Sequence, residues 1–167
     1  MNQKSKKPNN FAFIDSQNLN LGTQRMGWKL DWRKFRKYLR DKHNVGTAYM
    51  FIGYMSDNEA LYEYMHELGF LVVLKPTIDI SSNSQKDDGK SKPGEEKEKE
   101  KPIIKGNVDA ELVLYALKEM PNYDKAIIVS GDGDFFSLAE YLEEQGRLEH
   151  ILTPNWQYST LLKVFEE

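Results

Sequence analysis

The sequence predicts an α/β protein with a three-layer α/β/α arrangement around a mostly parallel five-stranded sheet. Five short apolar runs, several of them rich in β-branched residues, occur at 11–15, 45–54, 70–74, 126–129 and 149–152. Continuous apolar runs of this kind are typical of strands that are buried on both faces. Helical patterns separate the runs, and this alternation predicts a sheet with helices on both sides.

The composition limits the class of protein. At 167 residues the chain is long enough for one domain with a hydrophobic core, which we place at 11–167, with 1–10 as a flexible polar tail. No apolar run is long enough to span a membrane, and the N-terminus has no signal-peptide pattern. The chain has no cysteine, which excludes disulfides and thiolate metal sites and favours a cytoplasmic location. The net charge of −3 argues against nucleic-acid binding by bulk electrostatics, so any such contact needs a local basic patch.

The first half of the chain contains three of the strands and two helices. The strand at 11–15 ends in Asp15, and we interpret 19–27 as a loop. A helix at 30–42 has a basic face, which is either a polyanion-binding surface or solvent-exposed charge. After the second strand, a helix over 57–68 ends at Gly69, because glycine suits the left-handed conformation of a helix C-terminus.

The second half contains a charged segment, at about 81–101, that interrupts the pattern. It has no large apolar residue, so we expect a disordered insertion in a surface loop. A helix at 108–118 follows, and after the fourth strand a helix at 135–145 ends at Gly146. The residues after the last strand predict one more short helix, whose apolar side chains pack back on the core: Leu161, Leu162, Val164 and Phe165.

Acidic residues at two strand ends are predicted to meet. Right-handed crossovers place the first three strands on one side and bring the fourth strand beside the first. These two strands then flank the point where the strand order reverses, and ligands bind outside the carboxyl ends of the strands at such a point. Asp15 ends the first strand, and Ser130-Gly131-Asp132-Gly133-Asp134 follows the fourth. We therefore expect Asp15 and Asp132 to lie close together.

Four carboxylates are candidates for a metal site: Asp15, Asp109, Asp132 and Asp134. Oxygen-only ligand sets suit hard divalent cations such as Mg²⁺ or Mn²⁺, which activate water and polarise phosphoryl oxygens. Helix geometry offers another explanation, because Asp134 can cap a helix that starts at Phe135 and the helix dipole favours Asp109 at a helix start. The predicted meeting of acids at one switch point favours the metal site.

Several other polar and aromatic residues have two interpretations each. Asn18 either contacts a ligand or closes a turn, and Lys105 is a candidate for holding a polyanion. Three tryptophans either stack on bases or pack in the interior, and packing is the default: Trp28, Trp32 and Trp156. Motifs of other chemistries are absent from the sequence, since there is no phosphate-binding loop ending in Gly-Lys-Ser/Thr, no GxGxxG after the first strand and no GxSxG elbow.

Three segments, in order along the chain, resemble the motifs of NYN domains. They are Phe13-Ile14-Asp15-Ser16-Gln17-Asn18-Leu19, Lys105-Gly106-Asn107-Val108-Asp109-Ala110-Glu111-Leu112 and Val129-Ser130-Gly131-Asp132-Gly133-Asp134-Phe135. NYN domains belong to the PIN-like nuclease superfamily and include a LabA-like bacterial branch. The resemblance covers nearly the whole chain except the tails and the charged insertion. It implies a PIN-like, Rossmann-like fold and a ribonuclease that uses Mg²⁺ or Mn²⁺, with endonucleolytic action on single-stranded RNA.

The resemblance also implies roles for individual residues. The metal and catalytic carboxylates fall on Asp15, Asp109, Asp132 and Asp134, and the substrate-binding residues on Asn18, Lys105 and Ser130. Many relatives carry another aspartate about two helical turns after the first helix-start acid, where this chain has Tyr115, and Glu111 is a candidate substitute. Homo-oligomerisation is left open.

Two alternatives to the nuclease remain. One is a catalytically decayed NYN module that binds RNA or protein, which the net negative charge and Tyr115 favour. The other is a haloacid-dehalogenase-like phosphatase, because Gly131-Asp132-Gly133-Asp134 resembles the late acidic motif of that family. Such phosphatases need an aspartate two residues after the strand-one nucleophile, where this chain has Gln17, so this alternative ranks lowest.

Overall fold

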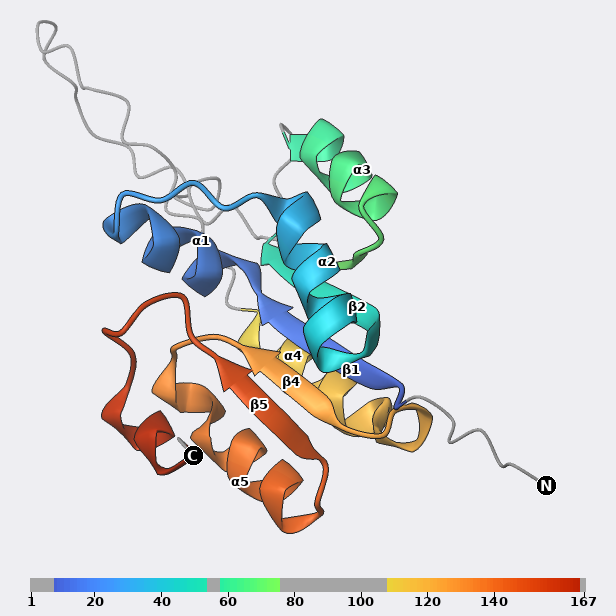
Figure 1. Ribbon diagram of the computed structural model, residues 1–167, viewed down its shortest axis with the longest axis vertical. Coiled ribbons are helices and arrows are strands. Elements are labelled where there is room, and N and C mark those ends of the chain that lie inside the picture. Colours follow the sequence, from blue (N-terminus) through green and yellow to red (C-terminus); the bar gives the residue numbers. More distant parts are fainter. Residues whose placement is uncertain (1–7, 54–57, 76–107, 166–167) are drawn as a thin grey trace, which may run out of the picture.

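A five-stranded parallel sheet forms the centre of the computed structural model, which describes residues 8–53, 58–75 and 108–165 (Figure 1). The strands are β1 (Asn10–Asp15), β2 (Val45–Gly53), β3 (Leu71–Lys75), β4 (Ala126–Val129) and β5 (Leu148–Leu152). The α-helices are α1 (Ser16–Arg25), α2 (Trp32–His43), α3 (Glu59–Glu67), α4 (Asp109–Lys118) and α5 (Phe136–Glu144). Short 3₁₀ helices are η3 (Met120–Asn122), η4 (Gly133–Phe135) and η5 (Thr160–Phe165).

The strand order is β3-β2-β1-β4-β5, and every neighbouring pair is parallel. After β3 the chain returns past β1 and forms β4 on its other side. The strand order therefore reverses at the boundary between β1 and β4, as the sequence predicts. Ile14 pairs with Val129, so the residues that follow these two strands emerge side by side. This register places Asp15 and Ser130 at the same edge of the sheet.

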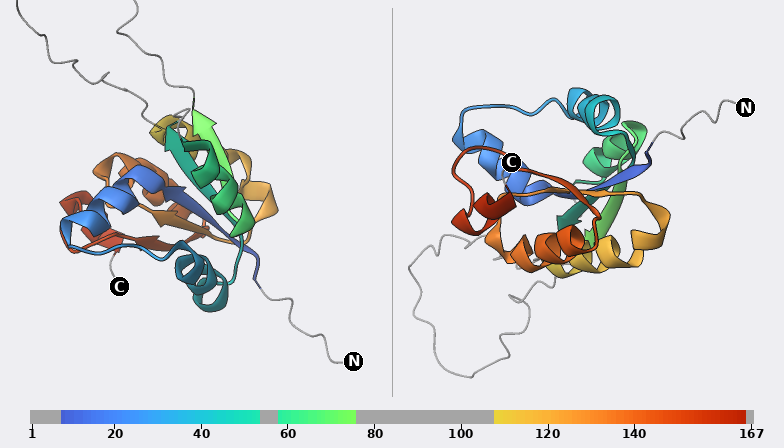
Figure 2. Two further views of the ribbon diagram at one scale, coloured as in Figure 1. Left: turned by 90° about the horizontal axis from the view of Figure 1, so that it is seen from above. Right: turned by 60° about the horizontal axis from the view of Figure 1, so that its bottom comes forward.

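Helices cover both faces of the sheet, which confirms the three-layer arrangement (Figure 2). Side chains alternate along β1, because successive residues of a strand point to opposite faces. Phe11 and Phe13 pack in one apolar cluster with residues of α4 and α5. Ala12 and Ile14 pack in a second cluster with residues of α1, α2 and α3.

The predicted loop at 19–27 is wrong over most of its length, because 16–25 form α1. This segment contains asparagine, glycine and threonine, which are weak helix formers, so its local pattern does not predict a helix. Contacts with the rest of the protein stabilise this helix in spite of its low helix propensity. Asp15 caps the helix, Leu19 is buried, and the Thr23 hydroxyl donates to the carbonyl of Leu19.

The ends of the other helices agree more closely with the sequence. Gly69 and Gly146 both have positive φ, at +86° and +66°, immediately beyond α3 and α5. The predicted C-terminal helix is the 3₁₀ helix η5, but its apolar side chains are not all packed inward. Leu162 is buried and Phe165 contacts Phe136, whereas Leu161 and Val164 are exposed.

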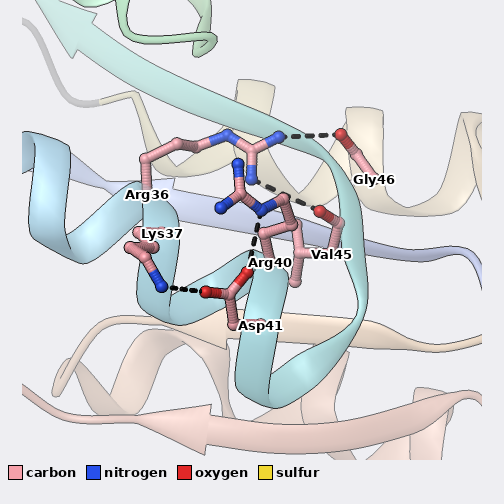
Figure 3. Close-up of polar contacts among 6 residues, drawn as sticks. All are labelled: Arg36, Lys37, Arg40, Asp41, Val45 and Gly46. Carbon is pink, nitrogen blue, oxygen red and sulfur yellow. Dashed lines mark hydrogen bonds and ion pairs between the residues drawn. The ribbon is translucent and has the colours of Figure 1, made fainter.

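The basic face of α2 makes contacts within the protein (Figure 3). The Arg36 guanidinium donates to the carbonyl oxygens of Val45, Gly46 and Gly69, all at the amino ends of β2 and β3. Lys37 and Arg40 both pair with Asp41, and Lys34 lies 3.8 Å from Asp31. Lys37 and Arg40 thus share one carboxylate, while carbonyl oxygens at the edge of the sheet opposite Asp15 engage Arg36.

Several predictions lie outside the described residues. These are residues 1–7 of the tail predicted at 1–10, the charged insertion at 81–101, the first residue of the 57–68 helix, and Lys105. Asn10, which is predicted to belong to the tail, is instead buried at the start of β1. Within the described residues, no helix is both long enough and apolar enough to cross a bilayer.

Candidate metal centre

Asp15 lies at the carboxyl end of β1 and is 5% exposed. One carboxylate oxygen, Oδ1, accepts the main-chain N–H of Asn18 at 3.0 Å and so caps α1. The other, Oδ2, accepts the Ser130 hydroxyl at 3.1 Å. Both oxygens of Asp15 are thus engaged by protein donors at the point where β1 and β4 meet.

Burial raises the pKa of the Asp15 carboxyl above its ordinary value of 3.8. The hydrogen bonds from Asn18 and Ser130 act in the opposite direction, and the negative charges of Asp109 and Asp132 raise the pKa further. Asp15 therefore lies close enough to the other acids to experience their charge, and a cation at this edge would offset that repulsion.

Ser130 connects Asp15 to the turn after β4. This side chain is fully buried, and its Oγ accepts the main-chain N–H of Asp132 at 3.1 Å while it donates to Asp15. The next residue of the turn, Gly131, donates its N–H to the side-chain oxygen of Asn18 at 2.9 Å. The turn is thereby fixed to both β1 and α1, which determines where Asp132 lies.

Asp132, not Asp134, provides the helix cap in this turn. Its Oδ1 accepts the N–H of Asp134 at 3.0 Å at the start of η4. The capping alternative considered from the sequence therefore applies to a different aspartate, and Asp134 is left as an exposed side chain in the first turn of η4.

Three carboxylates come together at this edge: Asp109 from the start of α4, Asp132 and Asp134. One oxygen from each lies within 4.8 Å of the others, and we refer to these three residues as the acidic cluster. Among the described residues, Asp15 does not belong to a group with this spacing. The cluster consists only of carboxylates on partly exposed or exposed residues, and this donor set fits hard cations such as Mg²⁺ or Mn²⁺.

Neither Tyr115, which stands where many relatives have an aspartate, nor its candidate substitute Glu111 belongs to the acidic cluster. The Tyr115 ring packs edge-on against Tyr49 and Phe51, with centroid distances of 5.5 and 5.6 Å. The Glu111 carboxylate lies 3.1 Å from the Lys75 ammonium at the end of β3. The aromatic side chain thus fills space in the core, and Glu111 is committed to an ion pair.

The segment 153–159 also forms part of the site, which the sequence pattern does not indicate apart from the two interpretations of Trp156. It crosses from β5 toward α1, where the Asn155 side chain donates to the carbonyl of Gly22 at 2.9 Å. The N–H of Ser159 donates to the carbonyl of Gly131 at 3.0 Å. Gly22, Gly131 and Gly133 are the local signal that allows this approach, because a Cβ on any of them would collide with the segment.

The comparisons with known proteins agree with this architecture. The sequence profile of the NYN domain matches residues 11–163. The low amplitude and bright protein LabA of Synechococcus elongatus is 25% identical over 141 residues, which are 81% of this chain and 69% of LabA.

A solved structure has the same fold. A protein of unknown function from Vibrio parahaemolyticus superposes with a TM-score of 0.66, over 94% of this chain and 99% of that chain. At 20% sequence identity this likeness concerns the fold alone.

Proposed function

The chain belongs to the NYN domain family, within the PIN-like nuclease superfamily, and on this premise we propose that it is a metal-dependent endoribonuclease. Its substrate in this proposal is single-stranded RNA, and its reaction is hydrolysis of phosphodiester bonds. The observation that carries the proposal is the acidic cluster of Asp109, Asp132 and Asp134 at the switch point of the sheet. The absence of cysteine fits a reducing compartment, and we place the activity in the cytoplasm.

The acidic cluster would hold one or more divalent cations, Mg²⁺ or Mn²⁺. What such an ion supplies when bound is polarisation of a phosphoryl oxygen and activation of water. Three carboxylates at this spacing repel one another, so their neutralisation by a cation is favourable.

The residues behind the cluster position it. Asp15 and Ser130 tie the end of β1 to the turn after β4, and Asn18 holds the Gly131 amide. Asp15 lies outside the acidic cluster, so the geometry supports a positioning and charge-balancing role for it, and each of its oxygens keeps a lone pair for a cation. The substrate role of Lys105 rests on the family resemblance alone.

A decayed NYN module is the second candidate, because Tyr115 contributes to the aromatic core where many relatives have an acid. This candidate predicts RNA binding without turnover. The phosphatase alternative ranks lowest, since Gln17 stands where such phosphatases need a second aspartate.

Cleavage of an end-labelled single-stranded RNA with Mn²⁺, with and without chelator, tests the proposal. We expect cleavage that the chelator abolishes and that Asp132→Asn lowers at least about 100-fold, because several kcal/mol of charge stabilisation are lost. Asp41→Asn, at an exposed aspartate of α2 on the opposite edge of the sheet, is the matched control and should cleave normally. Equal cleavage by wild type and Asp132→Asn would reject the nuclease.

Metal binding is measured separately from turnover by thermal unfolding. A cation that binds the folded chain at 100 times its Kd adds about 2.7 kcal/mol of stability, which corresponds to a Tm rise of about 5 °C or more. We expect this rise with Mn²⁺ for wild type and Asp41→Asn but not for Asp132→Asn. RNA binding with neither cleavage nor a Tm rise in Mn²⁺ would favour the decayed module.

A further inference from the structure

Trp156 is the most exposed large apolar residue among the described residues, with 71% of its surface accessible. It lies on the segment 153–159, next to the turn that carries Asp132. Exposure of a large indole has a cost in water, because apolar surface is not buried. The default expectation that this tryptophan packs in the interior is therefore wrong, and its location requires another explanation.

The backbone around Trp156 is held in place on both sides. Before it, the Asn155 side chain donates to the carbonyl of Gly22 on α1 and accepts the N–H of Gln157 at 2.7 Å. After it, the N–H of Ser159 donates to the carbonyl of Gly131. These bonds join the segment to two elements of the site, so the exposed indole is presented from a constrained loop.

The segment that carries Trp156 contacts the turn before Asp132. A Cβ placed on Gly131 would lie 2.9 Å from Cβ of Tyr158, so Tyr158 abuts the residue that precedes Asp132. Trp156 is two residues from Tyr158, and two residues span at most about 7 Å. The Trp156 backbone therefore lies within about 7 Å of a residue that contacts this turn, a separation that a strand of a few nucleotides can span.

The charge distribution indicates what such a ligand needs from the protein. The net charge is −3, and on α2 main-chain carbonyls engage Arg36 while Lys37 and Arg40 both pair with Asp41 (Figure 3). Phosphate contacts alone are thus a weak source of affinity here. Base stacking on an aromatic face supplies affinity without positive charge and tolerates any base sequence.

We propose that Trp156 is a stacking platform for an unpaired base of an RNA strand whose backbone crosses the acidic cluster. This inference rests on the proposed function for the identity of the strand. It makes Trp156 a determinant of single-strand preference, because a base within a duplex does not present its face to a side chain.

The test is a binding measurement that does not depend on turnover. The probe is a fluorescein-labelled decamer of uridine, followed by anisotropy with Ca²⁺ in place of Mn²⁺, and a gel confirms that the probe stays intact. We compare wild type, Trp156→Ala, Trp156→Phe and Trp28→Ala. Trp28 is the control matched for exposure, since it is 64% exposed and its main-chain N–H donates to the carbonyl of Thr23 on α1.

We expect Trp156→Ala to raise Kd at least about fivefold, the lower end of what one stacked base contributes. Trp156→Phe should retain part of the affinity, and Trp28→Ala should bind within twofold of wild type. Unchanged binding by Trp156→Ala, an equal loss in Trp28→Ala, or no binding by wild type would each overturn the inference. The nuclease proposal fails independently, if Mn²⁺-dependent cleavage is absent while the decamer still binds through Trp156.

Discussion

The side-chain oxygen of Asn18 accepts a hydrogen bond from the main-chain N–H of Gly131 at 2.9 Å, across 113 residues of sequence. This bond joins the first turn of α1 to the turn that carries Asp132. The orientation of the acidic cluster therefore depends on a helix that contributes no carboxylate to it.

We expect Asn18→Ala to lower the free energy of unfolding by about 1–3 kcal/mol, because the partly buried Gly131 amide loses its acceptor. Cleavage should fall by more than stability explains, since the turn before Asp132 is no longer held. Asn18→Asp retains an acceptor and should recover part of the stability, because its negative charge adds to the repulsion among the neighbouring acids. Urea unfolding and the RNA cleavage assay measure the two effects, and wild-type behaviour of Asn18→Ala in both would refute the positioning role.

Gly133→Ala tests the approach of the C-terminal segment to the acidic turn. The new Cβ would lie 3.0 Å from Cβ of Ser159 and closer still to its hydroxyl, so one of the two backbones has to move. We expect a loss of about 1–3 kcal/mol in the free energy of unfolding. Adding Ser159→Gly relieves the collision, and a double-mutant cycle measured by urea unfolding should give a favourable coupling energy. Strict additivity of the two changes would contradict the contact.

Arg36→Ala tests whether the basic helix is structural. The guanidinium donates to three carbonyl oxygens at the amino ends of β2 and β3, and hydrogen bonds of charged groups contribute about 1.5–3 kcal/mol. We expect a loss of stability in that range, with no change in affinity for the uridine decamer. Arg33→Ala, at an exposed arginine of the same helix, should stay within about 0.5 kcal/mol of wild type. A loss of RNA affinity in Arg36→Ala without a loss of stability would instead indicate a polyanion-binding surface.

His43 makes the stability of the fold dependent on pH. It is 4% exposed, and burial lowers the pKa of its imidazole below 6.5, with smaller contributions from His150 and Lys42, while Glu149 acts in the opposite direction. The folded state therefore binds this proton less tightly than the unfolded state. The stability is fully present above pH 6.5 and is lost as the pH falls through the lowered folded pKa.

Thermal unfolding between pH 7.5 and 5 measures this effect. We expect the Tm of wild type to fall more steeply over this interval than the Tm of His43→Gln, whatever the Tm of the variant at pH 7.5. His150→Gln removes a neighbouring positive charge and should show an intermediate slope, because the His43 and His150 rings are 5.0 Å apart. Parallel pH profiles of wild type and His43→Gln would rule out the contribution of His43.

The strands and the switch point could be predicted from the sequence because they depend on local composition and on chain direction. The apolar runs from Phe11 to Ile14 and from Ala126 to Val129 are buried on both faces in any parallel sheet, and crossover handedness then places them side by side. The same logic brings Asp15 to the edge that carries Asp132.

Only the tertiary structure decided what each of these acids touches. The helix α1 forms from a weak local sequence because Asp15 caps it and Leu19 is buried, and these contacts have no signature in the residues 16–25 themselves. Asp109 joins Asp132 and Asp134, whereas Asp15 turns its oxygens to Asn18 and Ser130. The exposure of Trp156 was likewise decided by the tertiary structure, since the sequence favoured packing in the interior. Local periodicity reports which side of an element is buried, but Asp15 and Asn18 meet Ser130 and Gly131 across more than 100 residues of sequence, and only packing brings these segments together.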